Sequence, residues 1–451
     1  MTKFFMEQVK THQIYEWIKS FAQKDSVDFD FHGFCLEQSK VLFEKQDLKN
    51  CTCSELKHLN LRVLKGDRAG TSYTKDFSKK SLEDCYQRAV DSLNFSDKKE
   101  RGFLSKNESY KDFSPFYDEG FKNLTIEDKI KKAEEITKGS LGIDKRIQPV
   151  YSSVKDFNTE NFFGNSEGSQ SFYKANYIMA SCYSLAIQEN SRSESDSESF
   201  ARNYDNIDFK KVGQEAALKA LNKLNAIVPE TKRYPVIFKA GPAAGELLLF
   251  LANLMNGKAV FEGASCLKKD SLSNRLFSKE FSLYDDPFSL WGFGSSPFDG
   301  EGFASEKTTL VEKGVLENYL TDSFFSKALK IPHTRKAFWN EGGSLNISTT
   351  NLLMPEGKTS FEYLVKEFPK VIIIDSLKGA GYNPTSGDFS KEAIGFLCEG
   401  GEKTPLHQFT VSGNIKDLFS NILKVGADNE IYAGRVKTPS FLVPDLMIAG
   451  K

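Results

Sequence analysis

The glycine-rich stretch from Gly379 to Glu402, GAGYNPTSGDFSKEAIGFLCEGGE, constrains the fold of this chain more than any other segment. It follows a short apolar run, Val371 to Ile374. Glycines at this density mark positions that need a positive φ angle or a close approach of another backbone, and the Asn-Pro and Ser-Gly pairs mark turns. Because apolar residues such as Phe389 lie between these signals, the stretch predicts strands joined by tight turns and not a linker.

Patterns elsewhere in the chain predict a mixture of helices and strands. Thr125 is placed to cap a helix, and residues 150–173 show a strand, turn, strand pattern. Further along, the chain has a strand at 234–240, an apolar helix at 243–255 and a hairpin at 310–316.

We therefore predict an α+β fold in two parts. The N-terminal mixed α/β region covers residues 1–228 and is divisible into two subdomains near residues 110–125. The C-terminal domain, residues 229–451, is predicted to be β-rich with few helices. A chain of 451 residues is long enough for two or three domains.

Charge and cysteine content narrow the class of protein. With 60 basic and 61 acidic side chains the net charge is −1, which argues against a dedicated nucleic-acid binder. The chain lacks an apolar run long enough to span a membrane, and its first residues, MTKFFMEQVKTHQ, do not resemble a secretory signal. Seven scattered cysteines indicate reduced thiols. We expect a cytoplasmic protein.

Residues 190–200, NSRSESDSESF, form an acidic, serine-rich segment. Low-complexity polar segments of this kind are usually solvated loops. We predict a loop here, and a phosphorylation or docking segment is the alternative.

A nucleotide-binding loop is suggested by Gly357-Lys358-Thr359-Ser360 and by the apolar, acid-ended run at 371–375. A complete phosphate-binding motif also needs a glycine where this chain has Leu352, and it needs a strand directly before the loop. We interpret the match as coincidence.

The sequence contains no self-sufficient motif for a nucleophilic enzyme or for a metal site. Cys266 could act as a nucleophile only beside a histidine, and none of the histidines is placed by spacing to serve it. Cys51, Cys53 and His58 lack a fourth ligand at a standard zinc spacing. Carboxylates are plentiful, and those near turn signals are first of all turn residues. The carboxylates that we consider as metal ligands are Asp285, Asp286, Asp299, Glu301 and Asp388.

Six long motifs follow one another along the second half of the chain. One begins at Pro384 within the glycine-rich stretch, and the others lie at residues 285–302, 308–329, 350–357, 410–428 and 439–450. In sequence and in order these motifs resemble the TldD/PmbA (TldE) family, and the resemblance runs from about residue 35 to the end of the chain.

The resemblance implies a heterodimeric metallopeptidase. In such a complex the TldD-type subunit carries an H-E-x-x-x-H helix and a cysteine as ligands for the metal, for which we expect zinc. The TldE/PmbA-type subunit lacks these ligands and completes the chamber. Family members are associated with maturation of ribosomally made peptides, such as microcins, and with degradation of an antitoxin.

The apolar helix at 243–255 lies where the metal-binding helix is expected. There Leu249 and Leu254 occupy the two histidine positions and Phe250 the glutamate position. Residues i and i+5 are ~140° apart on a regular helix, so a metal-binding version would need a bend. The last cysteine is Cys398, so the expected cysteine ligand near the C-terminus is also absent. The chain resembles the TldE/PmbA type, with no catalytic residue, metal ligand or cofactor of its own.

We thus expect a non-metal-binding subunit that acts with a TldD-type partner on unfolded polypeptides or peptide precursors. The alternative is a partner-independent, chaperone-like homodimer that binds peptides without proteolysis. A membrane or nucleic-acid partner is not expected. The family-signature residues, which we expect to be structural or to line the chamber, are Gly381, Pro384, Gly387, Asp388, Phe389, Ser390 and Gly395.

Overall fold

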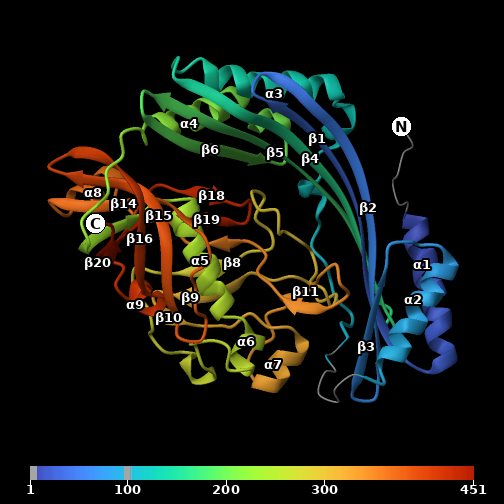
Figure 1. Cartoon of the computed structure of the whole chain (residues 1–451). Helices are drawn as coiled ribbons and strands as arrows, with labels where there is room; N and C mark the ends of the chain where they lie inside the picture. The colour runs from blue at the N-terminus through green and yellow to red at the C-terminus, as the bar shows by residue number, and fades with distance from the viewer. Residues whose placement is uncertain (1–7, 96–101, 103) are drawn as a thin grey trace.

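The computed structural model describes residues 8–95, 102 and 104–451. Residues 1–7 lie outside the described residues. They begin the N-terminal segment that does not resemble a secretory signal. A long curved sheet arches over a second, β-rich body (Figure 1). The predicted α+β class is confirmed, with few helices in the C-terminal half. Among the described helices, none is both long and apolar enough to cross a membrane.

The N-terminal sheet is antiparallel throughout. Its strands, in spatial order, are β3 (Arg68–Thr74), β2 (Asp47–Lys65), β1 (Asp28–Glu44), β4 (Ile147–Asn165), β5 (Gln170–Gln188) and β6 (Ser191–Ala201). The predicted strand, turn, strand pattern at 150–173 is confirmed, and both strands are longer than the prediction. Strands of this length curve, so one end of the sheet reaches over the C-terminal body (Figure 1).

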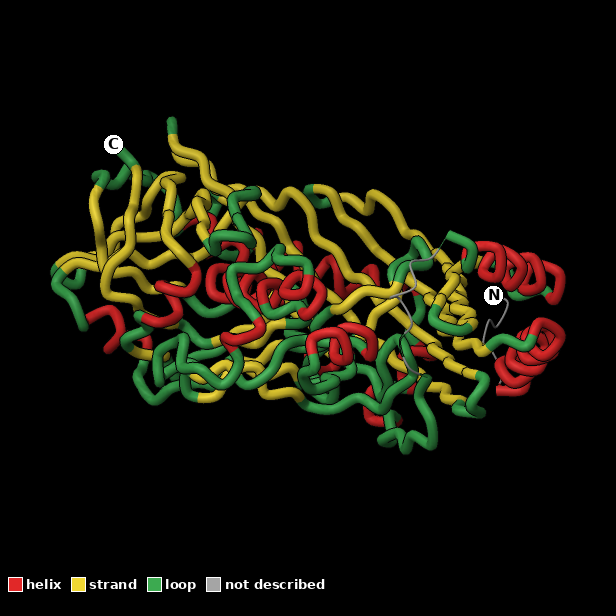
Figure 2. The backbone as a smooth tube through the Cα atoms, turned by 90° about the horizontal axis from the view of Figure 1, so that it is seen from below, coloured by secondary structure: helices red, strands yellow, loops and turns green. Residues whose placement is uncertain are grey.

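Two helix pairs pack on this sheet. The pair α1 (Gln8–Asp25) and α2 (Lys79–Ser92) lies at one end, and α3 (Ile126–Leu141) and α4 (Phe209–Leu221) lie together at the other (Figure 1). Figure 2 shows α1 and α2 at the end of the elongated molecule opposite the C-terminus. Thr125 caps α3 as predicted, in a reciprocal capping box.

The prediction of a loop at 190–200 is wrong, because β6 pairs with β5 over its whole length. Alternate serines face α4 and the turn that follows it: Ser197 Oγ donates to Glu215 on α4 at 2.9 Å, and Lys223 Nζ, just after the helix, donates to Ser195 Oγ at 3.0 Å. The acidic residues between the serines are exposed. The segment is a half-buried strand whose inner face is serine instead of an apolar residue, so its alternation has the period of a strand without the usual hydrophobicity.

The C-terminal body contains a six-stranded sheet that closes on itself through an additional pairing of β16 with β20. Its strands, in order, are β16 (Glu402–Asn414), β15 (Asp388–Glu399), β14 (Lys370–Lys378), β7 (Lys232–Phe238), β20 (Phe441–Ala449) and β17 (Lys424–Val425). The glycine-rich stretch supplies the turns around β15, so its prediction as strands joined by turns is confirmed.

A second sheet and several short helices complete the body. The sheet contains β10 (Val315–Leu316), β9 (Thr308–Glu312), β8 (Leu283–Asp285), β13 (Leu352–Leu353), β19 (Val436–Thr438) and β18 (Glu430–Tyr432), and a separate hairpin joins β11 (Ala337–Trp339) to β12 (Leu345–Ile347). The short helices of this body are α6 (Gly257–Phe261), η4 (Lys269–Ser271), α7 (Ser323–Leu329), α8 (Phe361–Lys366) and α9 (Ile415–Ser420). The N-terminal part has three more, η1 (Ser114–Phe116), η2 (Glu119–Asn123) and η3 (Tyr204–Asn206).

Helix α5 (Pro242–Leu254) lies in the core of this body. It begins at Gly241, whose φ of 91° suits glycine, with a proline at the first helical position. Most of its side chains are buried against strands of both sheets. The predicted apolar helix is therefore confirmed, and its burial follows from the lack of a polar stripe.

Candidate functional site

A buried arginine joins the two parts of the molecule. Arg62 on β2 donates from Nε to both carboxylate oxygens of Asp30 on β1, at 3.1 Å each. Its Nη1 donates at 2.8 Å to Glu301, which belongs to the C-terminal body. All three side chains are at most 4% exposed. Because a charge buried this deeply needs a partner, the contact fixes the sheet against the body.

Two further carboxyls surround Glu301. Asp299 accepts hydrogen bonds from the backbone N–H groups of Glu301 and Phe303, at 3.0 Å each. Asp322 caps α7, accepting from Phe325 N at 2.7 Å. We call Asp30, Arg62, Asp299, Glu301 and Asp322 the carboxylate clasp.

The clasp has more carboxyl groups than cations. Burial, and then the charge of Glu301, raises the pKa of Asp322 to about 7 and raises the pKa of Asp299 well above its ordinary value. Like charges held close together out of water favour the protonated form. The arrangement can therefore hold protons near neutral pH.

One set of side chains in the described ranges has the spacing of a metal site. The ligand atoms of Asp299, Glu301 and His333 lie within 4.8 Å of one another. Burial lowers the pKa of His333, and its buried Nε2 has no hydrogen-bond partner. The hydrogen bonds of Glu301 argue against a metal at this position. Its carboxylate already accepts from Arg62 at 2.8 Å and from Ser323 Oγ at 2.7 Å. A divalent cation would share that carboxylate with a guanidinium.

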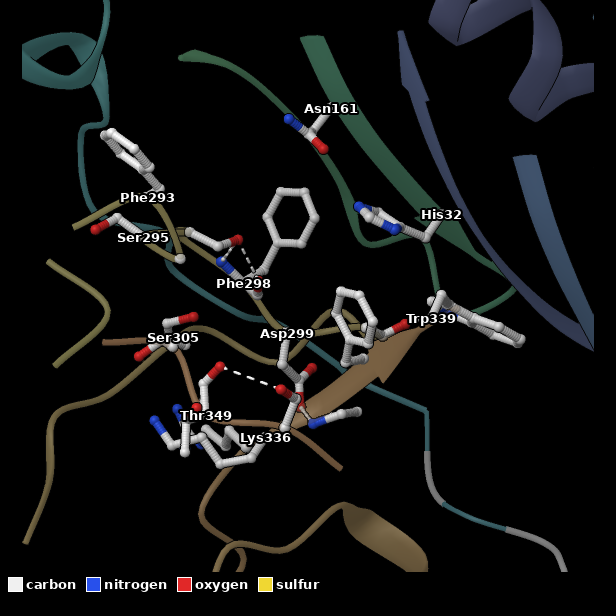
Figure 3. A pocket seen from close by; sticks show the side chains of 18 of the residues that line it. His32, Asn161, Phe293, Ser295, Phe298, Asp299, Ser305, Lys336, Trp339 and Thr349 are labelled. Carbon is white, nitrogen blue, oxygen red and sulfur yellow. Dashed lines mark hydrogen bonds between the residues drawn. The ribbon is translucent and has the colours of Figure 1, made fainter. Parts of the chain in front are cut away.

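A cavity of about 170 Å³ adjoins the clasp, and Asp299 belongs to both. The N-terminal sheet contributes His32 and Asn161, which lie across from Phe298 and Asp299 of the C-terminal body (Figure 3). Burial, and then the neighbouring His58, lowers the pKa of His32 to about 4, so this imidazole is neutral at pH 7. The cavity therefore has walls from both parts of the chain.

Two cationic side chains of the cavity wall, Lys336 and Arg335, form ion pairs with acidic residues of the protein. Lys336 lies 2.6 Å from Asp285 and donates to the carbonyl of Glu306 at 3.1 Å. Arg335 pairs with the carboxylate of Glu306 at 2.7 Å. Asp285 also accepts from Thr350 N at 2.7 Å. These groups brace the loops that form the floor of the cavity.

The three predicted metal-motif positions do not share one environment. Leu249 is half-buried on the accessible side of α5, whereas Leu254 is completely buried. Phe250 is buried and stacks on Tyr382 with ring centroids 4.1 Å apart. In this regular helix the positions i and i+5 point in different directions, as helical geometry requires. That these positions replace a metal motif stays a prediction.

The family-signature residues lie around β15, away from the residues of the clasp. Gly387 has a φ of 82°, and a Cβ at Gly395 would meet the carbonyl of Ile373 at 1.9 Å, so both positions require glycine. Exposed Asp388 accepts from Asn414 Nδ2 at 2.9 Å. The remaining residues build the same turn: Ser390 N donates to Gly381 O at 2.8 Å, Pro384 O accepts from Cys266 N at 2.8 Å, and Phe389 is buried.

One polar contact of the glycine-rich stretch was not predicted from the sequence. Lys391 is 1% exposed and lies 2.6 Å from Glu246 on α5. Tyr382 also donates to Glu246, at 3.1 Å. We call Lys391 and Glu246 the α5 pair. Its signal in the sequence is faint: Glu246 is the single charged residue of an otherwise apolar helix.

The other candidates take ordinary structural roles. Burial raises the pKa of the Cys266 thiol, which opposes a nucleophilic role. His58 is buried and bonded to Asn60 at 2.9 Å, whereas Cys51 and Cys53 are exposed. The GKTS sequence lies between the two-residue strand β13 and the short helix α8, and Gly357 N donates to Gly426 O at 2.7 Å, so this N–H group is not free to bind a phosphate. Asp286 accepts from Phe288 N at 2.9 Å, as a turn residue does.

Comparisons with known proteins agree over nearly the whole chain. Family models match at residues 37–93 (PmbA/TldA metallopeptidase domain 1), 119–224 (central domain) and 231–450 (C-terminal domain). Metalloprotease PmbA of Escherichia coli O157:H7 is 27% identical over 401 residues, covering 87% of this chain and 86% of the relative. A PmbA homologue of Buchnera aphidicola is 27% identical over 391 residues, covering 84% of each chain.

Solved structures share the fold. TldE from Thermococcus kodakarensis aligns with a TM-score of 0.88 at 19% identity, covering 98% of this chain and 100% of that one. A candidate modulator of DNA gyrase from Thermotoga maritima aligns with a TM-score of 0.89 at 24% identity, covering 97% and 100%. With three family models matched in order along its length, the chain belongs to the PmbA/TldD family of metallopeptidases.

Proposed function

We propose that this chain is the non-metal-binding subunit of a heterodimeric metallopeptidase that acts on unfolded polypeptides or peptide precursors. The observation that carries the proposal is the composition of α5, PAAGELLLFLANL. Zinc peptidases need imidazole, thiolate or carboxylate ligands. The one such group on this helix, Glu246, is engaged by Lys391.

The carboxylate clasp does not fit a catalytic metal either. A catalytic zinc keeps three protein ligands and an open position for water. Here the Arg62 guanidinium lies 2.8 Å from Glu301 and would repel a divalent cation. We therefore assign the zinc of the complex to a TldD-type partner subunit and no step of the reaction to a metal in this chain.

This subunit would supply walls that hold the substrate. Polypeptides are commonly bound as an added strand along a sheet edge, and the strands flanking residues 379–402 are candidates for chamber wall or partner interface. The cavity that contains His32 and Asp299 lies at the seam, by which we mean the contact between the N-terminal sheet and the C-terminal body. It offers a second surface, built from both parts of the chain. Peptide maturation in the cytoplasm is the role we propose for such a complex.

The test compares the purified chain alone with the chain co-expressed with a TldD-type subunit from the same genome. We expect a stable complex that contains zinc and cleaves an extended peptide, and no cleavage by this chain alone. Stoichiometric zinc together with peptidase activity in the isolated chain would refute the proposal. A homodimer that binds peptides but never associates with a TldD-type subunit would instead support the alternative hypothesis of a partner-independent, chaperone-like protein.

A further inference from the structure

Arg435 lines the cavity at the seam, and we find no ion-pair partner for it among the residues that the structure describes. Arg435 lies in the turn between β18 and β19, and its main chain is held on both sides: its N donates to Tyr432 O at 3.1 Å, and its O accepts from Leu352 N at 2.8 Å. Its guanidinium makes neither a hydrogen bond nor an ion pair with any residue in the described part of the chain. The backbone is thus fixed while the charged group stays available.

The neighbouring acids do not neutralise this charge. Asp285 lies close enough to influence the pKa of Arg435, but its carboxylate is engaged by Lys336 and by Thr350. Arg335 and Lys336, the other two cations of the wall, have their own acidic partners. Arg435 therefore leaves the cavity with an uncompensated positive charge.

The position of the guanidinium favours binding of an anion. Arg435 is accessible to solvent, yet enough protein surrounds it that loss of hydration lowers its pKa. Attraction between opposite charges is stronger in such a recess than in open water. A guanidinium presents paired N–H groups that match the two oxygens of a carboxylate.

The rest of the wall suits a small, partly apolar group. Phe293 stacks on Tyr177 with centroids 3.9 Å apart, beside the turn that carries Arg435. Phe298 and Trp339 also line the cavity (Figure 3). A cavity of about 170 Å³ is well below the ~300–1,000 Å³ of sites for drug-sized ligands, so it fits roughly one residue of a peptide.

We propose that Arg435 binds a carboxylate of the peptide substrate and that the residue bearing this carboxylate lies in the seam cavity. The inference rests on the proposed function, because it assumes a peptide substrate. The carboxylate is the C-terminal one or that of an Asp or Glu side chain, and both have the same recognition chemistry.

Binding of labelled peptides to the purified chain, followed by fluorescence anisotropy, tests the proposal without a partner or cleavage. The probes are N-acetylated decapeptides of Gly, Ser and Ala ending in Phe: a free acid, the matching amide, and an amide with one internal Glu. We expect the free acid, or the Glu-containing amide, to bind about tenfold or more tightly than the plain amide. The tighter of the two identifies the source of the carboxylate.

Variants locate the binding group. Arg435→Gln should abolish the preference for the carboxylate, Arg435→Lys should retain part of it, and Arg192→Gln, which removes an exposed charge on β6, should leave it unchanged. Equal binding of all three peptides, no binding at about 1 mM, or an unchanged preference in a folded Arg435→Gln would overturn the proposal. If Arg435→Gln fails to fold, the comparison of peptides on the wild-type chain decides. Failure here leaves the partner and zinc tests of the proposed function unaffected.

Discussion

The carboxylate clasp and the α5 pair are both buried groups of charges, but they differ in balance. In the clasp one arginine faces several carboxyls and joins the N-terminal sheet to the C-terminal body. In the α5 pair one lysine faces one glutamate within a single body. A buried excess of carboxyl groups must be relieved by protons, whereas a matched pair of opposite charges needs none. Stability that depends on pH should therefore arise at the seam.

The largest effect is expected from Arg62→Met. The substitution leaves Asp30 and Glu301 buried without a cation, which costs about 3–5 kcal/mol in the free energy of unfolding at neutral pH. The loss should shrink at acidic pH, where protons replace the guanidinium. Denaturant unfolding at both pH values measures it, with Arg192→Met as the surface control. A loss below about 1 kcal/mol at neutral pH would show that the seam does not depend on this arginine.

Lys391→Met should cost less, about 1–3 kcal/mol. The carboxylate of Glu246 that remains is 21% exposed and still accepts from Tyr382, so water and the phenol compensate part of the charge. The double variant Lys391→Met/Glu246→Gln should recover part of the loss, because no charge is left unpaired. Chemical denaturation of both variants is the measurement, and a double variant no more stable than the single one would contradict this account.

Asp322→Asn should flatten the dependence of stability on pH. The raised pKa of Asp322 means that the folded chain keeps a proton that the unfolded chain has lost. The corresponding stability is complete below the ordinary pKa of 3.8 and disappears as the pH rises through about 7. Asparagine keeps the acceptor for Phe325 N and cannot ionise. The drop in unfolding free energy between about pH 4 and pH 8 should decrease by roughly 2–4 kcal/mol, because each pKa unit of the shift corresponds to about 1.4 kcal/mol.

A matched control for that experiment is Asp208→Asn. Asp208 caps α4 in the same way, accepting from Lys211 N at 2.9 Å, but it is exposed. The pH profile of this variant should follow that of the wild type. If both variants changed the profile equally, capping and not the clasp would be responsible.

The smallest effect is expected from Arg233→Gln. Arg233 and Asp445 form an ion pair at 2.6 Å, with side chains 56% and 53% exposed. Exposed pairs contribute about 0–1 kcal/mol because water and salt screen them. Thermal unfolding at low and high salt should show a change within that range. A loss as large as that of Arg62→Met would mean that burial does not explain the difference among these pairs.

Local sequence signals predicted the elements whose structure depends on neighbouring residues. The cap at Thr125, the turns around Gly387 and the apolar helix α5 follow from backbone preference and composition. The error at 190–200 has a local cause as well, because serines replace apolar residues on the inner face of β6. Their partners, Glu215 on α4 and Lys223 just after it, are distant in sequence and cannot be inferred from the segment itself.

The candidate site depended on contacts between distant parts of the chain. Asp299 and Glu301 could be named as acids, but Arg62, which completes the clasp, lies 239 positions from Glu301. Lys391 and Glu246 likewise meet only when β15 packs on α5. Neither pairing leaves a periodic pattern that a reader of one sequence could detect.

The family, the mixed α+β class and the helix at 243–255 that carries Leu249, Phe250 and Leu254 could be predicted from the sequence, because motifs, capping and periodicity are local properties of the chain. Only the tertiary structure shows which charges meet at the seam, and that Arg435, which lines a cavity, has no ion-pair partner in the described part of the chain. Such pairings depend on how strands distant in sequence pack, and desolvation, which gives these charges their energetic weight, exists only after packing.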